Sequence, residues 1–134
     1  MRVLALDYGR ARCGCAVSDP TGVLATPLDA IPAPGSRRGR ARLRALVAEL
    51  GVQRIVVGLP LSLSGTDSTQ TAETRAFAQA LQDAVEVPVE LYDERFTTVM
   101  AQRDGGDADE DSRAAAHLLE SWLTRAGSRA VAHG

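Results

Sequence analysis

Lysine is absent from the chain, and cysteine and histidine are scarce. All 15 basic residues other than the two histidines are arginines, and the two cysteines are Cys13 and Cys15. We attribute the missing lysines to a compositional bias of the coding sequence. Two cysteines at positions i and i+2 of a strand share one face and cannot form a disulfide of regular geometry. Because no further cysteine or histidine lies nearby for a zinc site, we expect two buried thiols in a reducing compartment.

The chain also lacks a long apolar run and a strong net charge. No run approaches the ~18 residues of a membrane span, and Asp7 interrupts the apolar stretch near the N-terminus too early for a secretory signal. We therefore expect a cytoplasmic protein with no membrane partner. The net charge of −2 excludes a general polycation. The charges are nevertheless segregated, because five arginines lie within 37–44 and five acidic residues lie within 104–111.

The residues that are present suit one globular domain. The chain has 134 residues, of which 45% are hydrophobic, and this is enough to bury a core of its own. We expect one domain over residues 1–126 and a flexible tail over 127–134.

The first part of the chain predicts an antiparallel meander. Apolar segments at 2–7, 12–18 and 23–27 have the composition of strands, and turn-forming residues separate them at 8–10 and 19–22. Gly9 is expected to adopt the backbone conformation that the first turn requires.

Helices and strands alternate through the rest of the chain, which is typical of crossover connections. Ser36 is a suitable N-cap and Gly51 a suitable C-terminal stop for the first helix. The predicted elements are a helix over 37–50, a strand over 53–57, a helix over 68–83, a strand over 88–93, a short helix from 97 or 98 to 103, and a helix over 112–126. The helix faces predicted to point inward carry Leu43, Leu46, Val47 and Leu50; Ala72, Ala76, Phe77, Ala80 and Leu81; and Ala115, Leu118, Leu119, Trp122 and Leu123. The order predicts an α/β fold, with a mixed five-stranded sheet and flanking helices.

Carboxylates stand at the ends of three of these elements. Asp7 ends the first strand, Asp93 and Glu94 end the last strand, and Asp111 precedes the last helix. Carboxylates that meet at one edge repel each other unless a cation lies between them, and Mg²⁺ and Mn²⁺ prefer such oxygen ligands. Simpler roles are equally open from the residues alone. Asp7 could close a turn, Asp93 and Glu94 could form local ion pairs, and Asp111 could cap the helix.

Four segments resemble the motifs of the YqgF family. They are LALDYGRARCGCAVSD, VVGLPLSLSGT, YDERFTT and DSRAAAHLLESWL, and together they span residues 3 to about 124. The resemblance implies an RNase H-like nuclease fold. It implies that Asp7, Glu94 and Asp111 form an acidic site for Mg²⁺ or Mn²⁺, with Asp93 as an outer ligand. The spacing D-x-x-A-A favours Asp111 over Asp109 as the third ligand.

This chain departs from the YqgF pattern in two places. Ser62 and Ser64 stand where the family more often has asparagine or aspartate. The connection between the D-E-R motif and the final aspartate, which is usually longer and basic, is here short and acidic. Both changes affect segments that the resemblance places beside the substrate.

Several residues are candidates for binding nucleic acid. Gly9 would allow a close backbone approach, Gly58 and Pro60 would shape a rigid loop at the end of a central strand, and hydroxyls or guanidinium groups would contact phosphates. The candidates are Gly9, Arg10, Ser62, Ser64, Thr66, Arg95, Arg37, Arg38 and Arg40. Turn-capping hydroxyls, local ion pairs and a solvated helix face are the alternatives.

The resemblance implies a metal-dependent nuclease that matures the 5′ end of pre-16S ribosomal RNA. The first alternative is a Holliday junction resolvase acting on four-way DNA junctions, for which a homodimer is expected. A catalytically inactive RNA-binding protein is the second alternative. A phosphate-binding protein related to actin-like ATPases is a remote third, because those proteins need two such domains.

Overall fold

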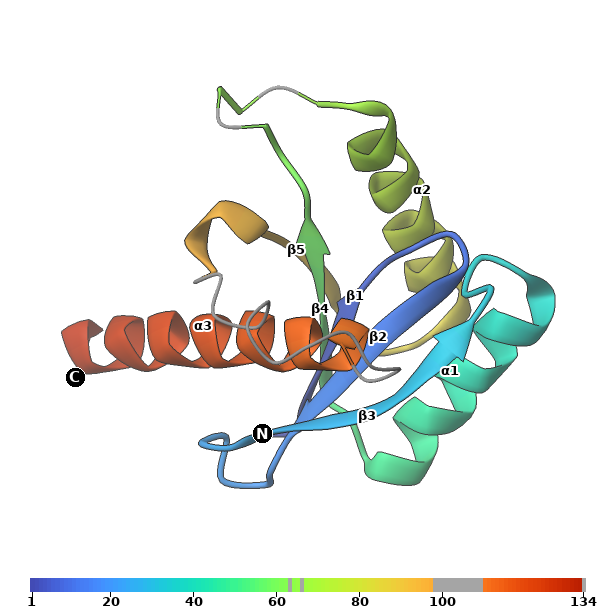
Figure 1. Cartoon of the computed structure of the whole chain (residues 1–134). Helices are drawn as coiled ribbons and strands as arrows, with labels where there is room; N and C mark the ends of the chain where they lie inside the picture. The colour runs from blue at the N-terminus through green and yellow to red at the C-terminus, as the bar shows by residue number, and fades with distance from the viewer. Residues whose placement is uncertain (63, 66, 98–109, 134) are drawn as a thin grey trace.

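The structure is a computed structural model that describes residues 1–62, 64–65, 67–97 and 110–133. Its elements follow one another as five strands, three α-helices and one short 3₁₀ helix (Figure 1). They are β1 (Val3–Asp7), β2 (Arg12–Ser18), β3 (Ala25–Pro32), α1 (Arg37–Leu50), β4 (Arg54–Leu59), α2 (Thr69–Ala84), β5 (Val89–Asp93), η1 (Glu94–Phe96) and α3 (Glu110–His133). None of these helices is long and apolar enough to cross a membrane.

The five strands form one mixed sheet in the order β3-β2-β1-β4-β5. β1 pairs antiparallel with β2, and β2 pairs antiparallel with β3, which confirms the predicted meander. β4 pairs parallel with β1, and β5 pairs parallel with β4. The mixed five-stranded sheet is therefore confirmed, with β1 at its centre.

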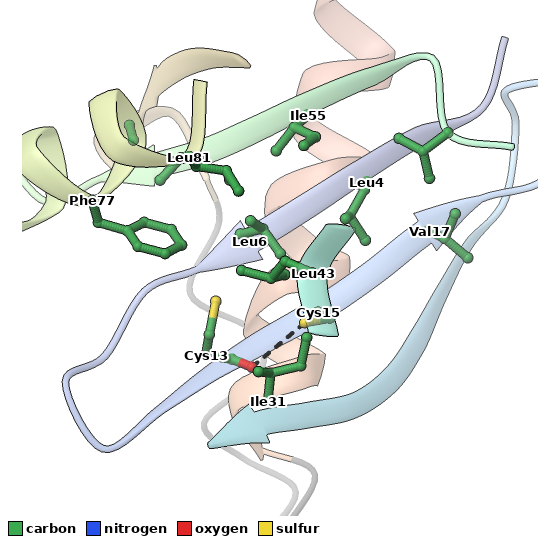
Figure 2. Packing of buried hydrophobic residues seen from close by; sticks show 13 residues of the cluster. Leu4, Leu6, Cys13, Cys15, Val17, Ile31, Leu43, Ile55, Phe77 and Leu81 are labelled. Carbon is green, nitrogen blue, oxygen red and sulfur yellow. Dashed lines mark hydrogen bonds between the residues drawn. The ribbon is translucent and has the colours of Figure 1, made fainter. Parts of the chain in front are cut away.

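Alternation along β1 divides the core between the two faces of the sheet. Leu4 and Leu6 belong to a cluster that α1 and α2 cover, in which Leu43 and Phe77 take part (Figure 2). Val3 and Ala5 belong to a second cluster, which α3 covers on the opposite face. The result is a three-layer arrangement with the sheet in the middle. Both cysteines are free and buried in the first cluster, as predicted.

The boundaries of α1 agree with the predicted helix because both caps form. The Ser36 hydroxyl accepts a hydrogen bond from the Gly39 amide, and Gly51 adopts a left-handed conformation with φ of 62°. The predicted inward face is also confirmed, since Leu43 is buried and the other three apolar residues pack against the same cluster. Ser68 caps α2 in the same way, by accepting from the Thr71 amide.

The third strand differs from its prediction. It runs from Ala25 to Pro32, whereas a strand over 23–27 was expected. Pro27 and Pro32 do not prevent this longer strand, because β3 lies at the edge of the sheet and an edge strand does not need every N–H for pairing. Pro27 and Pro32 pair by register with Ala16 and Arg12.

The predicted inward face of α2 is partly wrong. Ala72 and Ala76 are exposed, whereas Phe77 and Leu81 are buried as expected. Thr71 and Thr74 are buried instead of the two alanines, and their hydroxyls donate to the carbonyls of Pro60 and Gln70 respectively. Threonine can be buried here because its hydroxyl finds a backbone acceptor.

Helix α3 has the predicted inward face but different ends. Ala115, Leu118, Leu119 and Trp122 are buried, as expected. The helix begins at Glu110 and continues to His133, whereas we expected it to span 112–126. The flexibility of residues 127–134 remains a prediction. The predicted helix from 97 or 98 to 103 falls largely outside the described residues, and Thr97 instead ends the short helix η1.

The start of α3 lies directly on strand β2 because Gly14 has no side chain. A Cβ atom at Gly14 would lie 1.9 Å from the Asp111 carbonyl oxygen and 2.9 Å from the Ser112 amide nitrogen. Ser112 is fully buried, and its hydroxyl accepts a hydrogen bond of 3.3 Å from the Cys15 amide. Gly14 and Ser112 together fix the first turn of α3 on the sheet.

We predict that Gly14→Ala destabilises the protein by about 1–3 kcal/mol, because the backbone of α3 must move away from β2 to accommodate the methyl group. Chemical denaturation followed by circular dichroism measures the change. Gly127→Ala is the matched control. Gly127 belongs to α3, and a Cβ atom there would meet no atom within 4 Å. This control should stabilise by about 0.5–1 kcal/mol. Equal stability of the Gly14 variant and the wild type would contradict the close approach.

Candidate active site

Three parallel strands end at the same edge of the sheet and bring acidic residues there. Asp7 is the last residue of β1, and Asp93 is the last residue of β5. β4 lies between them, and its last residue Leu59 pairs by register with Asp93. Glu94 follows as the first residue of η1. Ligands commonly bind at the carboxyl ends of strands in α/β proteins.

Asp7 and Glu94 are in direct contact across β4. Their carboxyl groups lie within hydrogen-bonding reach, so that Asp7, when protonated, donates to Glu94. Gly58 of β4 gives Glu94 the room to reach Asp7, because a Cβ atom there would lie 2.8 Å from Glu94 Oε1. The same missing side chain admits Leu118 of α3. Gly58 was expected to shape a loop. It instead lies within β4 and leaves room for the Glu94 and Leu118 side chains.

The environment raises the pKa of both carboxyl groups. Burial is the main cause of the rise in the pKa of Asp7 from its usual 3.8 to about 7, followed by the negative charge of Glu94 and the hydrogen bond to it, and then by the charge of Asp111. Burial also raises the pKa of Glu94, and the charge of Asp93 adds to the effect. Asp7 and Glu94 therefore share a proton near neutral pH unless a cation replaces it.

Asp111 lies next to this pair, but its carboxylate forms an ion pair with Arg12. Its backbone lies on Gly14, which is the register partner of Asp7. Its carboxylate oxygen Oδ2 accepts a hydrogen bond of 2.7 Å from Nε of Arg12, in an ion pair whose side chains are 38% and 58% exposed respectively. Asp111 stands in the first turn of α3, after Glu110, so it is not the N-cap of this helix.

The donor set at this edge suits a hard divalent cation, because Asp7, Glu94 and Asp111 offer only oxygen atoms. Among the described residues, however, no group of three acidic, histidine or cysteine side chains is arranged to hold a metal ion. The structure brings two of the three predicted ligands together and leaves the third paired with Arg12. The alternative ligand Asp109 lies outside the described residues.

The two arginines predicted to neutralise a phosphate near the site both form ion pairs. Arg10 pairs with Glu73 of α2 and is strongly exposed. Arg95 donates from Nε and Nη2 to the carboxylate of Asp93, with a distance of 2.6 Å from Nη2 to Oδ2. The ion-pair alternative is therefore present for both, although Glu73 was not foreseen as a partner.

The other binding candidates lie on connecting segments and on α1. Gly9 does not have a positive φ, and its missing Cβ makes room for the Arg12 carbonyl at 2.7 Å. The hydroxyls of Ser62 and Ser64 are 3.0 Å apart, in the segment between β4 and α2. Thr66 lies outside the described residues.

The arginine cluster of α1 stands apart from the acidic pair. Arg37 and Arg38 are exposed, and Arg40 donates to the Gly35 carbonyl at 2.6 Å. Within the described part of the chain, no hydrogen bond or ion pair links these three arginines to Asp7 or Glu94. Their binding of nucleic acid remains a prediction.

Three residues with a clear role at the site escaped the sequence reasoning. Gly14 had a usable signal, since a glycine inside a strand pattern indicates a bulge or a close backbone approach, and the β2–β3 register does shift between Cys13 and Cys15. Ser112 and Arg12 had none, because a buried serine and an exposed arginine acquire their roles through contacts between distant segments.

The comparison with protein families decides the assignment. The model described as "RuvX: Holliday junction resolvase" matches residues 1–125. The chain belongs to the RuvX family. This membership confirms the resemblance to YqgF, which names the same family, and it confirms the predicted nuclease class.

Relatives of this RuvX chain match over nearly its whole length. A protein of Koribacter versatilis (strain Ellin345) named "Putative pre-16S rRNA nuclease" is 40% identical over 136 residues, covering 94% of this chain and 88% of the relative. A protein of the same name from Moorella thermoacetica (strain ATCC 39073 / JCM 9320) is 39% identical over 140 residues, covering 98% and 100%.

A solved structure shares the fold of this RuvX chain. It is "T. thermophilus RuvC in complex with Holliday junction substrate", with a TM-score of 0.59 and 17% identity, over 95% of this chain and 96% of that one. The predicted RNase H-like fold is thereby confirmed.

The raised pKa of Asp7 predicts how the metal-free protein responds to pH. Between about pH 4 and pH 7 the folded state keeps a proton that the unfolded state loses, so stability should decrease as the pH rises through this window. One pKa unit corresponds to about 1.4 kcal/mol, and after allowance for partial exposure we expect a loss of about 2 kcal/mol. Denaturant titrations in the presence of a chelator at a series of pH values measure it.

Asp7→Asn should remove this loss, because the amide carries no charge at any of these pH values. The variant should be more stable than the wild type at pH 8 without metal. Asp29→Asn, at an exposed position of β3, should keep the wild-type pH dependence. A wild-type stability that stays level or increases over the window would contradict the buried carboxyl pair.

Proposed function

We propose that this RuvX protein cleaves phosphodiester bonds with a divalent cation, Mg²⁺ or Mn²⁺, held by Asp7, Glu94 and Asp111. The observation that carries the proposal is the contact between the Asp7 and Glu94 carboxyl groups at the sheet edge. Two partly buried carboxyl groups in contact are unfavourable once both are ionised, and a divalent cation relieves this repulsion. Such a pair is therefore typical of a metal site.

Each of the chain's own residues has a defined part in this proposal. Glu94 reaches Asp7 over Gly58, so the two carboxylates, from the ends of β1 and β5, would hold one cation together. Asp111 would supply a third oxygen ligand once its carboxylate is released from Arg12. A cation bound there would neutralise charge on the phosphate and activate water for attack.

The proposed substrate is precursor 16S ribosomal RNA, cleaved in the maturation of its 5′ end in the cytoplasm. This substrate is supported by the name that the full-length relatives carry. The proposed backbone contacts come from Arg10, Arg95 and the α1 arginines, since guanidinium groups bind phosphates through paired hydrogen bonds. Gly9 and the hydroxyls of Ser62, Ser64 and Thr66 complete the proposed contact surface.

Resolution of four-way DNA junctions is the second candidate. The description of the family model favours it. A junction resolvase cuts two strands symmetrically, so this candidate requires a homodimer with two sites.

We predict that Asp7→Asn and Glu94→Gln each lower the rate of Mg²⁺- or Mn²⁺-dependent cleavage by at least about 100-fold, while the fold stays intact. Each change keeps the shape of the side chain and removes the charge that holds the cation. Gel assays with labelled nucleic acids measure cleavage, and circular dichroism checks the fold. Asp29→Asn is the matched control, because it changes the same residue type on an exposed strand. Unchanged cleavage by the Asp7 variant would refute the proposed site.

Two substrates separate the candidates. A 16S-type RNA with a 5′ extension should be trimmed in the presence of Mn²⁺, whereas a four-way DNA junction should be cut only if the protein forms a dimer. Light scattering on the same samples gives the oligomeric state. Binding of both substrates without cleavage, under all metal conditions, would instead identify an inactive RNA-binding protein.

A further inference from the structure

Arg12 forms an ion pair with one of the proposed metal ligands. It is the first residue of β2, and its Nε lies 2.7 Å from Oδ2 of Asp111. More than half of its side chain is exposed, at 58%, so the guanidinium group also faces solvent beside the acidic edge. Arg10, two residues earlier, differs in this respect because its partner Glu73 is not a proposed ligand.

The backbone of Asp111 is fixed, but its carboxylate has freedom. The main chain lies against Gly14, and the neighbouring Ser112 is buried and hydrogen-bonded to the Cys15 amide. The Asp111 side chain itself is 38% exposed and belongs to an ion pair at the surface. Such exposed pairs contribute little, and they exchange partners readily. A rotation of the side chain can therefore change the partner of Asp111 without moving α3.

We propose that Arg12 holds Asp111 in the metal-free protein and, when a divalent cation takes Asp111, turns to bind a phosphate of the nucleic acid. This inference rests on the proposed metal site. It assigns Arg12 two partners in succession, a carboxylate and a phosphate. The guanidinium group suits both, because its planar fork matches the two oxygens of either group.

The charges around the site favour this exchange. Asp7, Glu94 and Asp111 together carry up to three negative charges. A divalent cation among them therefore interacts more strongly with Asp111 than the singly charged, exposed guanidinium group does. Once Asp111 has moved, Arg12 is left with a full positive charge and a free fork near the edge where the phosphate would bind. The phosphate then restores the pairing of Arg12 and brings the nucleic acid close to the cation.

The first measurement is metal affinity without nucleic acid. We expect Arg12→Gln to bind Mn²⁺ about two- to five-fold more tightly than the wild type, because the cation no longer competes with the guanidinium group. Calorimetric titration of Mn²⁺ into the metal-free full-length chain measures the Kd. Arg10→Gln is the matched control, since it removes the same charge two residues earlier but leaves Asp111 paired. Its Mn²⁺ affinity should match that of the wild type.

The second measurement is nucleic-acid affinity in the presence of Ca²⁺, with gels to confirm that the RNA stays intact. We expect Arg12→Gln to bind a fluorescein-labelled RNA hairpin with a 5′ extension several-fold more weakly than the wild type. Arg12→Lys should recover part of the loss, because lysine also binds phosphate, though as a point charge. Changes of opposite sign in the two affinities distinguish exchange from a structural defect, which would weaken both.

Two results would overturn the exchange while leaving the proposed function intact. The first is a wild-type Mn²⁺ affinity in Arg12→Gln. The second is an equal tightening in Arg12→Gln and Arg10→Gln, which would show a general effect of charge. A wild-type protein that binds no Mn²⁺ at all would overturn both the metal site and the exchange. Unchanged RNA affinity in Arg12→Gln would refute the phosphate contact.

Discussion

The contact between the carboxyl groups of Asp7 and Glu94 is the constraint on which the site depends. Two carboxyl groups that touch in a partly buried place resist ionisation, and this raises the pKa of Asp7 at the end of the central strand. The sheet order makes the contact possible, because only β4 separates the strands that carry the two residues. In the proposed nuclease, a cation held by this pair would stabilise the negative charge that develops at the phosphate.

Two missing side chains, on strands either side of β1, make this geometry possible. Gly58 on β4 lets Glu94 cross the sheet edge, and Gly14 on β2 lets α3 bring Asp111 close. Each glycine is placed where a methyl group would collide with atoms of the site or of its support. Asp111 is therefore positioned by backbone packing on Gly14, whereas Gly58 leaves room for the side chain of Glu94.

The sequence was most informative where local chemistry decides the structure. The caps Ser36 and Gly51 set the ends of α1, and both form as predicted. Sequence reasoning failed where the position in the sheet decides, as in β3, whose prolines are tolerated at an edge. The candidate ligands could be predicted from motifs, but the pairing of Arg12 with Asp111 could not. That ion pair joins residues 99 positions apart, and nothing local to either of them specifies it.

The location of Asp111 on the last helix has a consequence for synthesis of the protein. β1 and β5 leave the ribosome before α3, so a growing chain holds two of the three proposed ligands without the third. Docking of α3 on β2 buries the second core cluster and also brings Asp111 to the acidic edge. In the proposed nuclease, the metal site is therefore incomplete until α3 has been synthesised and has docked on β2.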